Sequence, residues 1–190
     1  GTRVPITGRC AAVSKSPLTN LYIDSAIGGR IGPELKRAGH DLLAIQGQAE
    51  KPSYLLVSPD EVAVKSAAGL WGKTTHEVER QLRKQDPKTC VLSTGPAGER
   101  LVRFACLTHD YFRSFGRGGL GAVLGAKRLK AIAIRGTDGV IPTPNRDREV
   151  GLVKQVAQRA RTAREHGHLL YVHGTPWLVD LANTTGMCPT

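Results

Sequence analysis

The sequence is poor in aromatic residues and has no long apolar run. Aromatic residues make up only 5% of the 190 residues, which disfavours a stacking surface for single-stranded nucleic acid. No run approaches the roughly 18–20 consecutive apolar residues that a membrane-spanning helix needs. The first residues, GTRVPITGR, lack the charged and then apolar pattern of a signal peptide. We therefore expect a protein without a membrane span.

Cysteine is also scarce, and its copies stand far apart, at Cys10, Cys90, Cys106 and Cys188. None of them forms a CxxC pair, and the histidines form no HExxH, so we expect no zinc or iron–sulfur site built within this stretch. The spacing leaves disulfides open, but it is not typical of a secreted scaffold. The default interpretation is buried free thiols in a cytoplasmic protein.

Acidic residues are outnumbered, at 16 against 27 lysines and arginines, which gives a formal net charge of +11 and a pI near 9.9. Such a balance fits a solvated basic surface, an anionic ligand, nucleic acid, or a missing acidic partner segment. The hydrophobic fraction of 40% is enough for a packed core. The length allows one large domain, or a domain with a fragment of another.

Turn residues and apolar periodicity predict an alternation of strands and short helices. Strands are expected at 10–14, 42–47, 53–58, 61–67, 90–93, 101–107 and 130–135. Helices are expected at 32–39, at about 76–85 after a cap at Thr74 or Thr75, and at 147–164 and 176–183.

After Pro142 and Pro144 the sequence changes from strands and turns to a polar, helical pattern, and we place a domain boundary there. The prediction is a domain over 1–143 and the incomplete beginning of a helical domain over 144–190. The last 45 or so residues are too few to bury a core of their own. The missing initiator Met and the ending at TTGMCPT lead us to expect a longer polypeptide.

The stretch Arg113–Lys127, RSFGRGGLGAVLGAK, is rich in glycine and carries three cationic side chains and no acid. Glycine lets backbone N–H groups approach an anion, and the flanking cations suit phosphate. Two other turns combine glycine with arginine, at 7–9 and 24–32. Turns that converge make a better site than one loop. The structural alternative is an ordered, glycine-rich connection with solvated arginines.

Three more specific interpretations of this stretch fit the sequence poorly. Its glycines spell GxGxxG, but no clean apolar strand precedes them and no acid follows at the end of a strand, as a dinucleotide fold requires. A phosphate loop fails because Ala126 and Arg128 occupy the positions of the required glycine and Ser/Thr. An RGG-type RNA-binding segment is disfavoured because apolar residues are interleaved with the glycines.

Several segments, taken in order, resemble the N-terminal domain of the tungsten-containing aldehyde ferredoxin oxidoreductase family. They are TGRCAAVSKSPLTN, DSAIGGRIGPELKRAGHD, IQGQAEKPSYLLV, LWGK, TGPAGERLVRFA and GRGGLGAVLGAKRLKAIAIRG. The resemblance runs from Gly1 to about Gly136 and continues more faintly to the end of the chain.

The resemblance implies an α+β fold, with a β-rich domain of two packed sheets and short helices before the start of a helical domain. It also implies tungsten, or molybdenum, held by the dithiolenes of two molybdopterin cofactors, and a [4Fe–4S] cluster bound outside this chain. Family members oxidise aldehydes to carboxylic acids and pass electrons to ferredoxin or a similar acceptor; a divergent branch reduces benzoyl-CoA. The remaining domains of the polypeptide complete the site, so this fragment alone is expected to be inactive.

Carried over by position, the resemblance implies that the cofactor is contacted by Arg9, Ala26, Gly28, Arg113, Ser114, Gly116 and Arg117. It further implies a magnesium ion between the pterin phosphates, held by backbone carbonyls at Ala26 and Ser114, where common members have asparagine and alanine. The catalytic residues are expected beyond Thr190. The alternative function is a non-catalytic basic module or scaffold fragment that binds an anion or nucleic acid.

Overall fold

The computed structural model describes residues 2–5 and 7–187, so Cys188 lies outside the described part. The chain divides into two compact units, with the division after Pro142 and with Arg3–Pro5 assigned to the second unit. The domain organisation predicted from the sequence, 1–143 and 144–190, stays a prediction for the complete protein. Among the described residues, no helix combines the length and the apolar character needed to cross a membrane.

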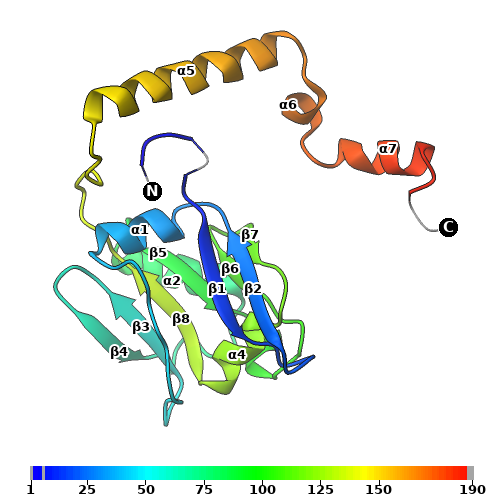
Figure 1. Cartoon of the computed structure of the whole chain (residues 1–190). Helices are drawn as coiled ribbons and strands as arrows, with labels where there is room; N and C mark the ends of the chain where they lie inside the picture. Colours follow the sequence, from blue (N-terminus) through cyan, green and yellow to red (C-terminus); the bar gives the residue numbers. More distant parts are fainter. Residues whose placement is uncertain (1, 6, 188–190) are drawn as a thin grey trace. The chain divides into compact units, whose positions relative to one another are not determined.

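The first unit is built on a six-stranded sheet (Figure 1). Its strands in spatial order are β4 (Val62–Ser66), β3 (Ser53–Val57), β8 (Leu129–Ile134), β5 (Cys90–Thr94), β6 (Leu107–His109) and β7 (Arg113–Phe115). All neighbours are antiparallel except β3 and β8, which run parallel. The parallel pair explains the long connection between these strands, because a hairpin can join only antiparallel neighbours.

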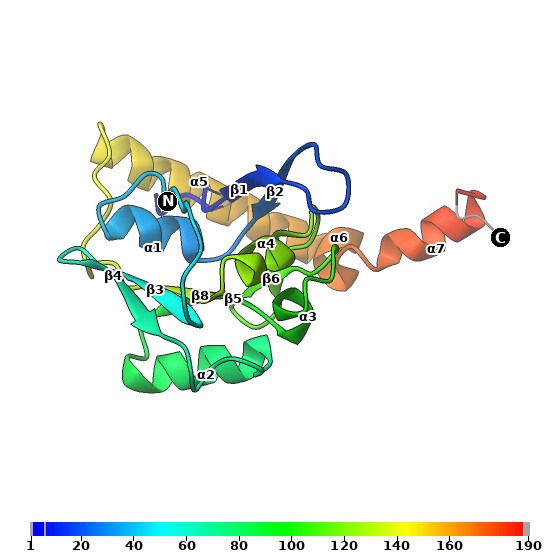
Figure 2. The same ribbon diagram turned by 90° about the horizontal axis from the view of Figure 1, so that it is seen from below.

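A second sheet is the hairpin of β1 (Cys10–Lys15) and β2 (Tyr22–Ile27). It lies on one face of the large sheet, together with α1 (Ile31–Arg37) and α4 (Leu120–Ala126), whereas α2 (Thr75–Gln85) covers the opposite face (Figure 2). The structure therefore confirms the expected β-rich unit of two packed sheets with short helices.

Strand β8 separates two apolar cores because successive side chains of a strand point to opposite faces. Ile132 and Ile134 belong to the core under the β1–β2 hairpin, α1 and α4. Ala131 and Ala133 belong to the core under α2, which Val78 and other residues fill from the helix side. All six residues of β8 are buried, as expected for a central strand covered on both faces.

The second unit is helical, as predicted. It contains α5 (Arg146–Glu165), α6 (Leu169–His173) and α7 (Trp177–Thr184). Helix α5 begins after Asn145, whose side chain accepts a hydrogen bond of 2.9 Å from the backbone N–H of Arg148. The predicted helices at 147–164 and 176–183 are confirmed within one residue at either end, and α6 was not predicted.

Two predicted strands are wrong. Residues 42–47 form no strand and pair with none of the strands in the described chain. Leu43 and Ile45 pack against the core, so their alternation reflects packing alone. Residues 101–107 also fail as a strand, because Leu101 has φ +59 and turn hydrogen bonds occupy 101–105. The strand begins only at Leu107, after a short helix α3 (Pro96–Glu99) that was not predicted.

A buried ion pair joins three segments on the α2 side of the sheet. Lys130 of β8 is fully buried, and its Nζ donates to a carboxylate oxygen of Glu99 and, at 2.7 Å, to the carbonyl oxygen of Lys73. The carboxylate of Glu99 also accepts from the backbone N–H of Gly72, at 2.9 Å. Burial lowers the pKa of Lys130, while the carboxylate of Glu99 opposes that shift.

We predict that Lys130→Met lowers the free energy of unfolding by about 3–5 kcal/mol, because it leaves the buried carboxylate of Glu99 without its cation. The double variant Lys130→Met/Glu99→Gln should recover part of that loss. Urea denaturation of the chain measures both. The control is Lys65→Met, which removes an exposed pair with Glu61 and should cost about 0–1 kcal/mol. Equal losses in Lys130→Met and Lys65→Met would contradict the prediction.

Candidate functional site

The three turns that combine glycine with arginine come together in the first unit, as the sequence predicts. A Cβ atom placed on Gly8 would lie 3.1 Å from the carbonyl oxygen of Gly29. One placed on Gly29 would lie 2.7 Å from Cδ of Arg113. The backbones at Gly8 and Gly29 and the side chain of Arg113 are thus in direct contact.

The end of β2 and the stretch that begins at β7 run side by side in opposite directions. Gly28 is close to the guanidinium of Arg113, with its Cβ position 3.5 Å from Nη1, whereas a Cβ on Gly118 would collide with the side chain of Ile23. Ala26 lies between these two contacts on the first segment. The other segment carries three predicted site residues in the same interval: Ser114, Gly116 and Arg117.

The predicted site residues all lie on accessible surface, with Gly28 half-buried and the other six exposed. Within the described part of the chain, Arg9, Arg113 and Arg117 take part in no ion pair and no side-chain hydrogen bond, whereas the neighbouring Arg30 faces Asp110, with 3.7 Å between Nε and Oδ1. Arginines without a carboxylate partner remain available for an anionic ligand.

Most glycines of the stretch Arg113–Lys127 allow close packing rather than access to a ligand. A Cβ on Gly121 would lie 2.5 Å from the carbonyl oxygen of Cys106, and one on Gly125 would collide with the backbone of Gly98. Gly116, in contrast, has nothing within 4 Å of its Cβ position. Of the glycines between Arg113 and Lys127, only Gly116 therefore has open space in front of it.

The expectation that this stretch is a loop is only partly correct. It forms strand β7, a turn with Gly118 and Gly119 at φ +84 and +70, and then helix α4. Glycine is a poor helix former, which hides the helix from the sequence. The helix forms because its glycines let it pack closely against α3.

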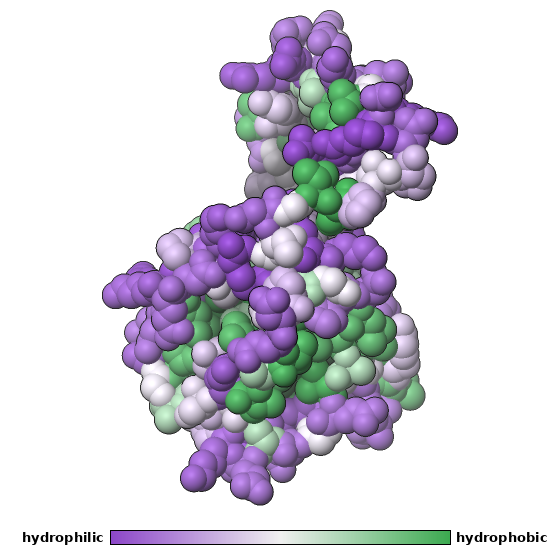
Figure 3. Space-filling view, turned by 90° about the vertical axis from the view of Figure 1, so that its left-hand side faces the viewer, coloured by the Kyte–Doolittle hydropathy of each residue, from purple (hydrophilic) through white to green (hydrophobic). Residues whose placement is uncertain are grey.

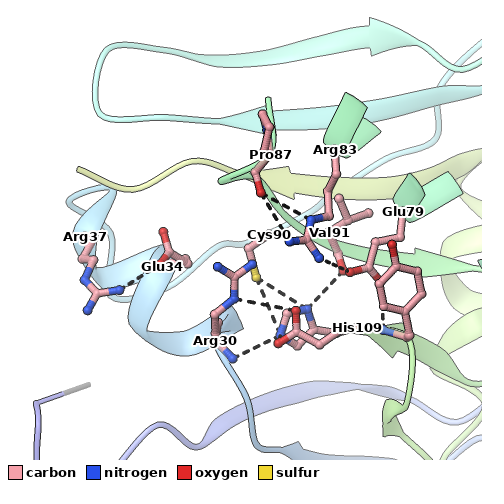
Figure 4. A network of polar contacts seen from close by, with 11 residues as sticks. Arg30, Glu34, Arg37, Glu79, Arg83, Pro87, Cys90, Val91 and His109 are labelled. Carbon is pink, nitrogen blue, oxygen red and sulfur yellow. Dashed lines mark hydrogen bonds and ion pairs between the residues drawn. The ribbon is translucent and has the colours of Figure 1, made fainter. Parts of the chain in front are cut away.

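His109 contacts the candidate site and was not predicted from the sequence. It ends β6, is fully buried, and lies beside Arg30 of the turn that follows β2 (Figure 4). Its Nε2 is 3.1 Å from the backbone nitrogen of Arg30, and its Nδ1 is 3.2 Å from the carbonyl oxygen of Val91. Burial lowers the pKa of His109. No motif around THD points to this role, because its partners are distant in sequence.

Comparison with known proteins decides the family. A family model described as "Aldehyde ferredoxin oxidoreductase, N-terminal domain" matches residues 1–136. The chain belongs to the aldehyde ferredoxin oxidoreductase family. The resemblance to the N-terminal domain of this family, stated from the sequence, is thereby confirmed.

The relatives of this aldehyde ferredoxin oxidoreductase family member include tungsten-containing enzymes. The chain is 39% identical over 191 residues to a tungsten-containing aldehyde ferredoxin oxidoreductase of Pyrococcus furiosus, and 40% identical over 192 residues to one of Thermococcus kodakarensis. Each match covers 100% of this chain, but the chain spans only 31% and 32% of the length of these relatives.

A solved structure with the same fold is the active-site complex BamBC of benzoyl-coenzyme A reductase in complex with 1,5-dienoyl-CoA. It matches with a TM-score of 0.80 and 32% sequence identity over 86% of this chain and 25% of that chain. Proteins with different names thus share this fold, and a fold alone does not fix a function.

We predict that Gly29→Ala destabilises the chain more than Gly39→Ala. Both glycines have φ +88, but nothing lies within 4 Å of the Cβ position of Gly39. Gly39→Ala should therefore cost only the strain of a left-handed backbone, about 1–2 kcal/mol. Gly29→Ala should cost about 1–3 kcal/mol more, because its methyl group must displace Arg113 and the ring of His109. Equal free energies of unfolding in urea would refute the close contact.

Proposed function

We propose that this chain is the cofactor-binding base of an oxidoreductase that holds tungsten, or molybdenum, through the dithiolenes of two molybdopterins. In the complete protein, the reaction is the oxidation of an aldehyde to a carboxylic acid. A [4Fe–4S] cluster bound outside this chain passes the electrons to ferredoxin or a similar acceptor. The remaining domains of the same polypeptide cover the cofactor.

The observation that carries the proposal is the group of unpaired arginines beside open backbone. Arg9, Arg113 and Arg117 are exposed and lack carboxylate partners in the described structure. They are combined with Gly28 and Gly116, which present backbone without a side chain. Pterin phosphates are anions, and an arginine fork with free backbone N–H groups suits them.

The outward face of the β1–β2 hairpin also fits a bulky flat group. Ala11 and Ala26 form a register pair, and both are exposed. Two small side chains facing outward leave the sheet surface flat and accessible. A group bound on this face would lie near Arg9, which precedes β1, and near the segment from Ser114 to Arg117, which runs beside β2.

Each residue then has a defined task. The arginines neutralise the pterin phosphates and fix their position, and the glycines permit close approach of the backbone. The carbonyl groups of Ala26 and Ser114 would hold a magnesium ion between the phosphates, a role that does not depend on the side chain. When bound, the metal–pterin group supplies the two-electron redox chemistry, and this chain supplies position and electrostatics.

We predict that the complete protein, expressed with tungstate or molybdate, contains both the metal and the pterin. Elemental analysis and fluorescence of the oxidised pterin measure them. Aldehyde-dependent reduction of a viologen dye or of ferredoxin then tests the substrate class, with benzoyl-CoA as the alternative substrate. Absence of both metal and pterin from well-folded protein would overturn the proposal. Salt-sensitive binding of DNA or RNA in a gel shift would then support the basic binding module.

We predict that Arg117→Ala and Arg113→Ala each weaken cofactor binding by about 10–100-fold in the complete enzyme, because each removes a charge-assisted hydrogen bond to a phosphate. The matched control is Arg80→Ala, an exposed arginine on α2, on the opposite face of the sheet. Metal and pterin content per folded protein should fall in the first two variants and stay unchanged in the third. Unchanged content in Arg117→Ala would count against its role.

A further inference from the structure

His109 connects the two halves of the candidate site. It pairs with Arg113 across β6 and β7, and residues directly opposite each other in a sheet project from the same face. Gly29 lies against both of them, with its Cβ position 2.7 Å from Cδ of Arg113 and 3.1 Å from Nε2 of His109. The imidazole of His109 therefore packs against the turn at Gly28–Arg30.

The contacts of its two ring nitrogens indicate which tautomer is present. The carbonyl oxygen of Val91 can only accept, so Nδ1 carries the proton and donates to it over 3.2 Å. The backbone N–H of Arg30 can only donate, so Nε2 is unprotonated and accepts from it over 3.1 Å. The neutral ring thus bridges β5 and the turn after β2.

The turn from β6 to β7 holds His109 and Arg113 in this arrangement and is itself strained. Asp110 and Tyr111 have φ +46 and +60. This left-handed backbone conformation is uncommon for residues other than glycine. Glu79 of α2, only 2% exposed, stabilises the turn by accepting a hydrogen bond of 2.9 Å from the backbone N–H of Tyr111. Backbone strain that a buried carboxylate maintains is typical of positions fixed for function.

We propose that His109 is a positioning residue of the cofactor site. Its Nε2 holds the backbone of Gly28–Arg30 beside Arg113, so that the glycine turn and the arginine present one surface to the ligand. The inference rests on the proposed function for the nature of that ligand, but the hydrogen bond to Arg30 can be tested without any cofactor.

Protonation of His109 would break this arrangement. Asp110 Oδ2 also lies 3.0 Å from Nε2, so a protonated Nε2 would donate to Asp110 and leave the N–H of Arg30 without an acceptor. The charged groups facing the ring are Asp110 and Glu79, which favour its protonation, and Arg30, which opposes it. The Cys90 thiol, 3.5 Å from Nδ1, stays neutral because burial raises its pKa.

The sign of the pH effect follows from these groups. Burial lowers the pKa of His109 in the folded protein, so the unfolded chain takes up the proton first, near pH 6.5. The stabilising contribution of the neutral ring is therefore complete above about pH 6.5 and is lost as the pH falls through the lower pKa of the folded state.

The test compares His109→Gln with His109→Asn in the complete protein. The amide of Gln reaches the position of Nε2 and can accept from Arg30, whereas that of Asn reaches only the position of Nδ1; neither titrates. We expect His109→Asn to show amide hydrogen exchange at Arg30 about tenfold faster, and metal and pterin content about tenfold lower. His109→Gln should stay near the wild type in both, and it should not show the loss of cofactor that the wild type shows as the pH falls through the lowered pKa of folded His109.

The outcomes separate the two proposals. Unchanged exchange at Arg30 in His109→Asn would overturn the positioning role, and so would faster exchange with full cofactor content. Equal cofactor loss in both variants would overturn it as well, because it would indicate a general packing role. Wild-type protein without metal and pterin would overturn the proposed function instead, while exchange at Arg30 would still decide whether His109 holds the turn.

Discussion

The close approach of the Gly29 backbone to His109 and Arg113 is the contact on which the first unit depends. It brings the end of the β1–β2 hairpin onto the edge of the six-stranded sheet, where only a residue without a Cβ atom fits. The positive φ of Gly29 adds a second reason for glycine. One backbone position therefore decides both how the two sheets meet and where the exposed arginines lie.

Core packing makes this meeting of sheets stable, and it leaves one face incompletely covered. Apolar side chains gather within a polar rim on one side of the first unit (Figure 3). A cavity of about 430 Å³ lies between β1 and the large sheet, lined by residues such as Leu43, Phe115 and Ile132. The chain spans about a third of the length of its relatives.

Local signals predicted much of this fold, and long-range contacts account for what was missed. Thr74 and Glu77 form a complete capping box, so α2 could be read from adjacent residues, and β8 was evident from its continuous apolar run. Residues 42–47 looked like a strand, but whether an apolar segment joins a sheet depends on a neighbour elsewhere in the chain. The site followed from its turns and the family resemblance, whereas His109 depends on Val91 and Arg30, which are 18 and 79 residues away.

The location of the positive charge says more about function than its total. Several arginines are paired within the fold, such as Arg37 with Glu34 and Arg83 with Glu79, so they belong to its internal electrostatics. A nucleic-acid-binding module would need its unpaired cations spread along a path that follows a phosphate backbone. Arg9 and Arg113 stand at glycine turns that touch one another, so two unpaired charges belong to this one area. A compact anionic ligand would find two unpaired guanidinium groups beside open backbone at this point, which supports the function proposed above.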